Sequence, residues 1–280
     1  MDVPRVALAG GAEMPVLGLG TWPMDDAEAE AAVGEAFARG YRLVDTAYGY
    51  RNERGVGEAI RASGVPRSEA FVTTKLNGEW HGEREAGDAL RDSLDRLGLD
   101  YVDLYLIHWP MPWRDRYVDA WRGLLRLRAD GLARAVGVSN FKPAHLDRLI
   151  AETGEAPEVN QLQLDPTVAR AESRAFHSAH GIVTQSWGPL GHGRELLRNP
   201  VIGRIADRHG RTPAQVVLRW HLQHGHIVFP KSVKPERIKE NIELFDFELS
   251  ADDMRALDGL DRGEEGRTGP NPDKFAYIPD

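Results

Sequence analysis

Short apolar runs alternate along the chain with longer segments in which apolar residues recur every three to four positions. A run of the first kind predicts a strand that is buried on both faces, and the second spacing predicts an amphipathic helix. The strands expected on this basis span residues 16–20, 42–45, 71–75, 102–108, 133–138, 159–162, 182–186 and 227–229. The expected helices span residues 28–39, 53–62, 84–97, 117–129, 144–151, 172–179, 201–208, 213–223, 235–242 and 251–257.

The order of these elements predicts eight strand–helix units, and hence a parallel sheet covered by helices. Such a sheet is either closed as a (β/α)8 barrel or open and doubly wound, and the open kind carries the pattern G-x-G-x-x-G after an early strand. The run Gly18-Leu-Gly20-Thr-Trp-Pro23 lacks the third glycine and leads into a proline. We therefore expect an α/β fold, a (β/α)8 TIM barrel with extra C-terminal helices and a tail loop over residues 262–280. Because no linker divides the chain, we expect one domain over residues 1–280.

The composition of the chain excludes several kinds of site and of binding partner. The chain of 280 residues has no cysteine and a formal net charge of −8. Disulfides, thiolate catalysis and zinc–thiolate sites are therefore excluded, and the spread of Lys and Arg lacks the basic footprint of a nucleic-acid-binding protein. No apolar run approaches the roughly 18 residues of a membrane helix, and residues 1–19 lack the pattern of a signal peptide. We expect a cytoplasmic monomer without nucleic-acid or membrane partners.

Polar residues stand where neighbouring predicted strands end, which is where the active site of such a barrel lies. Asp45, Lys75 and His108 end the second, third and fourth strands, and Tyr50 follows Asp45 in a loop. A carboxylate keeps an ammonium charged, and the ammonium can lower the pKa of a nearby phenol. Such a phenol can protonate an oxygen that is becoming an alkoxide, while an imidazole orients the same oxygen. The set fits carbonyl reduction with hydride from a cofactor, because no side chain donates hydride.

Each of these residues also has an ordinary structural explanation. Asp45 and Lys75 could form a salt bridge that only stabilises the fold, and His108 could be a core residue with satisfied hydrogen bonds. Tyr50 could pack at a surface loop. Their joint position at one rim of the predicted barrel favours the catalytic interpretation.

Four motifs resemble those of the aldo-keto reductase family. They are the first signature, Gly40–Glu53, the strand-4 motif, Leu106–Pro110, the strand-5 motif, Val136–Phe141, and the cofactor motif, Pro230–Asn241. They follow the family's order and extend over most of the chain. The resemblance implies a (β/α)8 barrel that uses NADPH/NADP+ and no metal, and it implies the roles given above for the four strand-end residues.

Two tyrosines compete for the role of proton donor. In the family the donor stands five residues after the aspartate and just ahead of an x-Asn-Glu run, which selects Tyr50. Tyr48 would then be a pocket wall or a residue that only packs.

The resemblance also implies contacts at the nicotinamide end of the cofactor. Ser139, Asn140 and Gln161 would hydrogen-bond the carboxamide, and Trp187 would stack on the ring, where many family members have tyrosine. Alternatively, Ser139 and Asn140 form a turn that caps the next helix, and Trp187 packs in the core. The pyrophosphate would lie along the loop that contains Ser186, Gly188, Leu190 and Gly191.

The adenosine end of the cofactor is implied to lie on residues 231–241. This segment carries four cationic and two acidic side chains, a net charge of +2 in a protein of −8. Lys231, Arg237 and the Ser232 hydroxyl would bind a 2′-phosphate, which NADH lacks. Val233 belongs to the same loop. Glu240 and Asn241 would hold the adenine, whereas Lys234 and Lys239 alone are typical of a solvated helix.

An aromatic wall is expected for the substrate, a small carbonyl compound such as an aldehyde, a ketone, a keto-sugar or an α-dicarbonyl. Its members are Trp22, Tyr48, Trp80, Trp109 and Trp113. Within the family the chain resembles the bacterial 2,5-diketo-D-gluconate reductases. It departs from that group in Trp22, where phenylalanine is usual, and in Asp165-Pro166, where His-Pro is usual.

Two other functions remain open. A Schiff-base aldolase would use Lys75 as its nucleophile, which needs an unpaired amine, and the nearby Asp45 argues against this. A non-enzymatic module that senses the redox state of NADPH would bind the cofactor without turnover, and the complete set of four polar residues argues against that.

Overall fold

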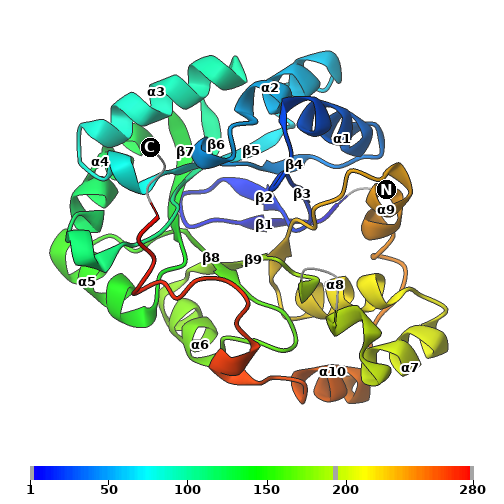
Figure 1. Ribbon diagram of the computed structural model, residues 1–280. Coiled ribbons are helices and arrows are strands. Elements are labelled where there is room, and N and C mark those ends of the chain that lie inside the picture. Colours follow the sequence, from blue (N-terminus) through cyan, green and yellow to red (C-terminus); the bar gives the residue numbers. More distant parts are fainter. Residues whose placement is uncertain (1–2, 192–194, 278–280) are drawn as a thin grey trace.

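The computed structural model describes residues 3–191 and 195–277, and its centre is a barrel of parallel strands (Figure 1). The strands are β3 (Leu19–Gly20), β4 (Leu43–Asp45), β5 (Phe71–Leu76), β6 (Val102–Ile107), β7 (Ala133–Ser139), β8 (Val159–Gln163), β9 (Val183–Trp187) and β10 (Ile227–Val228). They pair in chain order from β3 to β10. A parallel bridge between Leu17 and Val228 closes the ring, with the Gly18 N–H donating to the Val228 carbonyl at 2.9 Å.

Helices surround this barrel (Figure 1). The α-helices are α1 (Asp26–Ala38), α2 (Glu53–Ala62), α3 (Glu85–Leu97), α4 (Tyr117–Ala129), α5 (Pro143–Thr153), α6 (Ala171–His180), α7 (Pro200–His209), α8 (Pro213–Gln223), α9 (Pro235–Ile242) and α10 (Ala251–Asp258). Short 3-10 helices are η1 (Tyr48–Tyr50), η2 (Gly78–Trp80), η3 (Pro112–Arg114), η5 (Leu196–Arg198) and η6 (Gly263–Gly266). The predicted fold class is confirmed, and in the described part of the chain no helix is long and apolar enough to cross a membrane.

Alternate strand residues serve two hydrophobic layers. On β6, Leu104 and Leu106 belong to a cluster that fills the barrel interior, while Tyr105 and Ile107 belong to the cluster between strands and helices. The side chains of a strand alternate between its two faces, so a continuous apolar run satisfies both layers. This is why the central strands are recognisable in the sequence.

A hairpin at the amino end of the chain was not predicted. Its strands β1 (Arg5–Ala7) and β2 (Glu13–Pro15) pair antiparallel, and it lies across the centre of the ring in Figure 1. Met14 is buried in the interior cluster, so the hairpin closes the amino-terminal end of the barrel. The strands are only three residues long and partly exposed, which gives too short a pattern to detect, although Gly10-Gly11 was an available turn signal.

The tail beyond α10 lies over the carboxyl ends of the strands. The Arg262 N–H donates to the Thr167 carbonyl at 2.9 Å, and Gln163 Nε2 donates to Thr268 Oγ1 at 2.8 Å. The predicted tail loop is therefore present and attached to the barrel, with one short 3-10 helix, η6. Its last three residues, 278–280, lie outside the described residues.

Candidate active site

Three adjacent strands bring an ion pair and an imidazole together at the carboxyl end of the barrel. Asp45 ends β4, Lys75 lies near the end of β5, and His108 follows β6. Lys75 is fully buried, and its Nζ lies 2.5 Å from Asp45 Oδ1 and 2.8 Å from the Thr46 carbonyl. Tyr50 Oη lies 3.5 Å from the same nitrogen. The structure thus assembles the four residues that the sequence selected.

The turn that carries Tyr50 is held by the asparagine that follows it. Asn52 is fully buried, and its Oδ1 accepts a hydrogen bond from Thr46 Oγ1 at 2.7 Å. Its Nδ2 donates to the carbonyls of Thr21 and Met24 at 3.1 and 3.0 Å. Asn52 therefore links the end of this turn to the segments that contain Thr46, Thr21 and Met24.

The two tyrosines of this turn lie in different surroundings. The Tyr50 ring meets the His108 ring edge to face, with centroids 5.6 Å apart. The Tyr48 ring instead lies under the Arg96 guanidinium at 4.2 Å and meets Trp80 at 6.1 Å. Of the two, Tyr50 is the one beside the buried lysine.

Burial and pairing oppose each other in the ion pair. Burial raises the pKa of Asp45, and the charge of Lys75 and the amide of Gln161 oppose this rise. Burial would lower the pKa of Lys75, but Asp45 and Tyr50 outweigh that effect and the pKa of the lysine is raised. Lys75 is therefore a protonated, paired ammonium, as the sequence predicts, and not the free amine that an aldolase would need.

Burial disfavours the charged forms of both the Tyr50 phenol and the His108 imidazole. Burial raises the pKa of Tyr50 above its usual value of 10, while Lys75 acts in the lowering direction. Lys75 thus acts in the direction that the sequence reasoning gave it, but desolvation exceeds the effect of the ammonium. Burial, with Lys75 second, lowers the pKa of His108 well below 6.5, so this ring is neutral.

The predicted nicotinamide-binding residues are connected to the ion pair through one amide. Gln161 Nε2 donates to Asp45 Oδ2 at 2.8 Å, and the Gln161 carbonyl accepts from Ser139 Oγ at 3.0 Å and from the Asn140 N–H at 2.8 Å. Asn140 adopts a φ of 65°, and its Oδ1 accepts from Trp187 Nε1 at 2.8 Å. These four side chains form one group beside Asp45.

The loop after β9, where the pyrophosphate is expected, has two glycines with positive φ. Gly188 and Gly191 have φ of 61° and 58°, a conformation that favours glycine. Ser186 is buried, and its Oγ donates to the Leu164 carbonyl at 2.6 Å. Leu190 packs against the core. The loop continues into residues 192–194, which lie outside the described residues.

The predicted adenosine-binding residues gather around α9. Lys231 and Arg237 are exposed, and within residues 3–191 and 195–277 neither forms an ion pair. Val233 is 41% exposed, whereas Ser232 and Asn241 are buried. Ser232 Oγ accepts from the Lys234 N–H at 3.1 Å, and Glu240 Oε1 accepts from Thr212 Oγ1 at 2.6 Å. Two cations without an internal partner fit the binding of a phosphate.

The five aromatic residues expected at the substrate do not form one group. Trp109 stacks on Phe275 of the tail with centroids 4.2 Å apart, and Trp113 Nε1 donates to the Phe275 carbonyl at 3.0 Å. Tyr48 and Trp80 line a cavity of about 520 Å³. Trp22 is 55% exposed. Sequence reasoning missed Phe275, because nothing local to it indicates that the tail returns to the strand ends.

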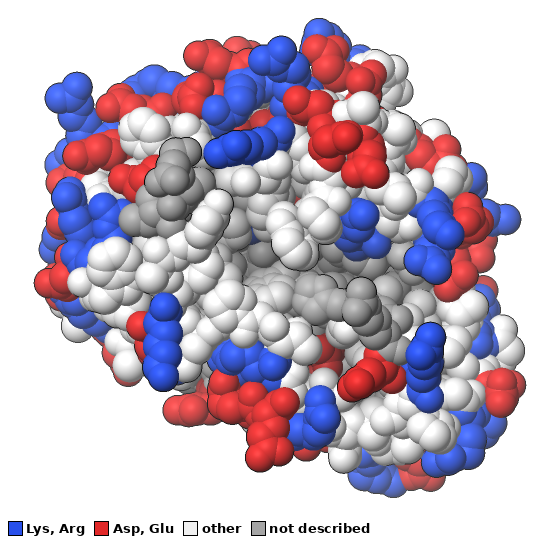
Figure 2. All heavy atoms as spheres, viewed as in Figure 1, with Lys and Arg blue, Asp and Glu red and all other residues white. Residues whose placement is uncertain are grey.

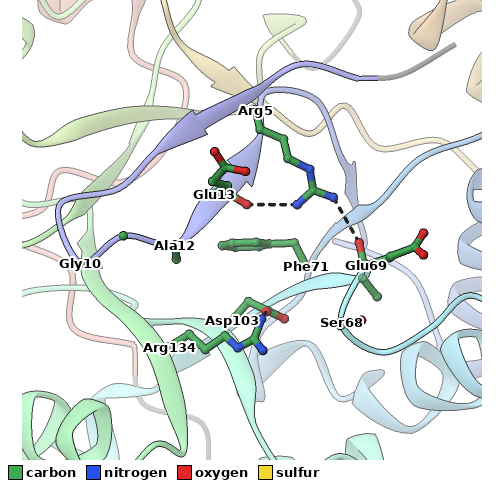
Figure 3. Close-up of a pocket in the computed structure, with 11 residues that line it drawn as sticks. Arg5, Gly10, Ala12, Glu13, Ser68, Glu69, Phe71, Asp103 and Arg134 are labelled. Carbon is green, nitrogen blue, oxygen red and sulfur yellow. Dashed lines mark hydrogen bonds and ion pairs between the residues drawn. The ribbon is translucent and has the colours of Figure 1, made fainter.

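Among the residues that Figure 2 colours, charged side chains lie mainly around the edge of the face that carries the tail. A different cavity, of about 440 Å³, lies at the amino-terminal end beside the hairpin (Figure 3). Some of its charged side chains have partners within the protein. Asp103 contacts Arg67 at 2.8 Å and Arg134 at 3.4 Å, and Arg5 donates to the carbonyls of Glu13 and Glu69. Because barrel enzymes act at the other end, we assign this cavity a structural role.

Comparison with known proteins decides the family. The sequence profile described as the Aldo/keto reductase family matches residues 16–262. The chain belongs to the aldo/keto reductase family. The motif-based assignment is thereby confirmed, and this aldo-keto reductase is an oxidoreductase. Among its described residues, no group of three or more His, Asp or Glu side chains could hold a metal ion.

Several relatives align along nearly their whole length. An aldo-keto reductase of Mycolicibacterium vanbaalenii is 54% identical over 273 residues, 98% of this chain and 97% of the relative. The methylglyoxal reductase DkgA of Salmonella typhimurium is 47% identical over 272 residues, 96% of this chain and 97% of the relative. The crystal structure of a mutant of Gox0644 in complex with NADPH has a TM-score of 0.93 at 44% identity and covers 98% of both chains.

Proposed function

We propose that this aldo-keto reductase reduces aldehydes, ketones, keto-sugars or α-dicarbonyls to alcohols with NADPH, and that Tyr50 gives the proton. One observation carries the proposal: the Tyr50 hydroxyl lies 3.5 Å from the Nζ of a fully buried lysine, which is itself paired with Asp45 at 2.5 Å. A phenol beside a fixed positive charge can give up a proton and leave a stabilised phenolate.

In the reduction, the substrate carbonyl oxygen takes the proton of Tyr50 as its carbon takes a hydride. NADPH supplies that hydride when it is bound. The phenolate that remains on Tyr50 faces the Lys75 ammonium, which Asp45 keeps charged and in place. Gln161 fixes the second oxygen of Asp45 at 2.8 Å, so the carboxylate cannot turn away from the lysine.

Local chemistry supports the choice of cofactor. Lys231 and Arg237 are exposed cations in an acidic protein. Arg237 lies in the first turn of α9, which begins at Pro235, and Lys231 precedes this helix. Backbone N–H groups at a helix amino end and a guanidinium both favour phosphate oxygens. The relative Gox0644 binds NADPH. These residues would hold the 2′-phosphate, and Ser139, Asn140, Gln161 and Trp187 the nicotinamide.

The relatives and the aromatic side chains near the strand ends support the proposed substrate class. A methylglyoxal reductase is 47% identical, which favours an α-dicarbonyl. Trp109, stacked on Phe275, offers an apolar face beside His108, with ring centroids of tryptophan and histidine 6.4 Å apart. A flat, small carbonyl compound fits such a surface.

The test follows NADPH absorbance while methylglyoxal, simple aldehydes and keto-sugars are supplied in turn, with NADH as the matched control. We expect turnover with NADPH on at least the α-dicarbonyl. Binding of NADPH without turnover on any carbonyl would support the redox-sensing module instead. Covalent trapping of a carbonyl substrate on Lys75 by borohydride would support the aldolase, and we expect no trapping.

A further inference from the structure

The last residue of β8 is a buried glutamine whose side-chain amide binds the tail. Gln163 is 3% exposed, and its Oε1 accepts hydrogen bonds from the backbone N–H groups of Thr268 and Gly269 at 3.2 and 2.9 Å. Its Nε2 donates to Thr268 Oγ1 at 2.8 Å. Gln163 therefore fixes two consecutive residues of the tail to the carboxyl end of the barrel.

The alternation of side chains along β8 places this amide above the one that contacts Asp45. Val159 belongs to the interior cluster of the barrel, so Gln161 and Gln163 lie on the same, interior face of the strand. Gln161 binds Asp45, whereas Gln163, two residues nearer the carboxyl end, binds the tail. The tail is thus attached to the strand face that also supports the buried ion pair.

The tail residue that Gln163 holds meets the indole of Trp187. Gln163 and Trp187 are partners in the register of β8 and β9. A Cβ built on Gly269 would overlap Trp187 Cη2 and lie 3.3 Å from Cζ2, both at the outer edge of the six-membered ring. Carbon atoms in ordinary contact are about 3.5–4.0 Å apart, so there is no room for a methyl group. The tail backbone therefore lies directly against the ring.

The tail is also fixed ahead of this point, on the loop after β8. The Arg262 N–H donates to the Thr167 carbonyl at 2.9 Å, and a Cβ on Gly266 would overlap the same oxygen. Glu264 forms an ion pair with Arg170. Because these contacts do not involve Gln163, loss of its amide should release residues 268 and 269 without detaching the whole tail.

We propose that Gln163 is a positioning residue for the nicotinamide end of the cofactor site, because it clamps Gly269 against the indole of Trp187. The ring is then held at two places, at Nε1 by Asn140 Oδ1 at 2.8 Å and at its outer edge by Gly269. The inference rests on the proposed function for its catalytic meaning, since Trp187 is proposed to stack on the nicotinamide. The position of the indole itself does not depend on that function.

That position is measured by NMR of the full-length protein labelled with nitrogen-15 in its tryptophans, without cofactor. The indole signal of Trp187 is identified by its loss in Trp187→Phe. Gly269→Ala adds a methyl group that must displace the ring or the tail, and Gln163→Leu removes all three hydrogen bonds to the tail. We expect both variants to move the Trp187 signal. An unchanged signal in either folded variant overturns the proposal.

Two variants are matched controls for these spectra. In Gly259→Ala the new methyl group lies 3.4 and 3.6 Å from the Arg255 and Ala256 carbonyl oxygens, which is ordinary contact, so the Trp187 signal should stay in place. Gln163→Glu keeps acceptor oxygens for both tail N–H groups, and the Thr268 hydroxyl can donate to the carboxylate, so it should preserve the signal. A signal that moves in Gly259→Ala, or moves as far in Gln163→Glu as in Gln163→Leu, overturns the specific role of the clamp.

A third variant serves if neither Gly269→Ala nor Gln163→Leu folds. Thr268→Val removes the hydroxyl that Gln163 Nε2 contacts and keeps the shape of the side chain. It should move the Trp187 signal in the same assay, and an unchanged signal there overturns the proposal.

Activity supplies the second measurement. In Gly269→Ala, kcat should fall about tenfold or more while the Kd of NADPH stays within about threefold, because only the reacting end of the site is misplaced. In the Trp187→Phe background, whose ring lacks the outer edge, the same substitution should lower kcat by less than about twofold. Equal losses in the two backgrounds overturn an effect through the indole. If the Trp187 signal moves as expected but Tyr50→Phe keeps its activity, the proposed function fails and the clamp stands.

Discussion

Replacing Lys75 by methionine tests what the ion pair with Asp45 contributes to stability and what it contributes to catalysis. The side chain is fully buried, and its nitrogen contacts three oxygens, at 2.5 Å on Asp45, 2.8 Å on Thr46 and 3.5 Å on Tyr50. Methionine fills a similar volume without the charge. Among the described residues, the Asp45 carboxylate would then keep one side-chain hydrogen bond, from the Gln161 amide at 2.8 Å.

The loss of one partner of a buried pair typically costs about 3–5 kcal/mol in the free energy of unfolding. For a protein of this size about 1 kcal/mol moves Tm by roughly 2–4 °C, so Tm should fall on the order of 10 °C. The double variant Asp45→Asn/Lys75→Met removes both charges and should recover most of the loss, since an uncharged pair of similar volume is often as stable. Melting of the three proteins by circular dichroism measures this.

The same variant changes the chemistry of Tyr50. Burial raises the phenol pKa and Lys75 acts in the lowering direction, so without the ammonium the pKa rises further. In the wild type, alcohol oxidation needs the phenolate and should improve as pH rises, whereas carbonyl reduction needs the phenol and should decline. In Lys75→Met both pH profiles of kcat/KM should move to higher pH, with rates lower by about 10²-fold or more.

Two results would refute this reasoning. A Tm of Lys75→Met within about 2 °C of the wild type would show that the pair is not buried as described. Identical pH trends of the two reaction directions in the wild type, with cofactor saturating and product release excluded as limiting, would show that Tyr50 is not the titrating group.

Three further changes test other parts of the account. Arg237→Ala should weaken the binding of NADPH about tenfold, or about 1.4 kcal/mol, and leave the affinity for NADH unchanged, both measured by tryptophan fluorescence. Equal losses of affinity for the two cofactors would contradict this. Phe275→Ala removes the stacking on Trp109, an interaction worth about 0.5–1.5 kcal/mol, and should raise the KM for the carbonyl substrate about 2- to 10-fold. An unaltered KM would show that the tail does not contribute to the substrate site. Burial lowers the pKa of His221 to about 3 and that of His177 to about 4. Below about pH 6.5 these two histidines therefore bind protons in the unfolded chain but not in the folded protein. The free energy of unfolding, measured by urea titration, should therefore fall as the pH drops below about 6.5. In His221→Gln the slope of this free energy against pH should be smaller by about 1.4 kcal/mol per pH unit. Equal slopes in the variant and the wild type would contradict the prediction.

Much of the barrel is readable from the sequence because its strands serve two buried layers. A continuous apolar run such as residues 102–107 satisfies both the interior and the helix-facing cluster, so the pattern is strong. The polar strand ends stand out against such runs, which is why Asp45, Lys75 and His108 could be selected. The hairpin at residues 5–15 is short and half exposed, and its pattern carried too little information.

The parts of the site that were missed depend on contacts far apart in the chain. Phe275 reaches Trp109 only because the tail folds back over the strand ends. The sequence indicates that a lysine lies near Tyr50 and acts to lower its pKa, but it does not show how completely the phenol is desolvated.

The most direct test of the central claim compares Tyr50→Phe with Tyr48→Phe in the NADPH-dependent reduction of methylglyoxal. Both variants remove one hydroxyl from the same turn, but only Tyr50 lies beside Lys75, while Tyr48 lies under Arg96. The account predicts that Tyr50→Phe lowers kcat by about 10²–10⁴-fold with NADPH affinity close to that of the wild type. Tyr48→Phe should change kcat only mildly. Retention of a tenth or more of kcat by folded Tyr50→Phe would contradict the assignment of Tyr50 as the proton donor.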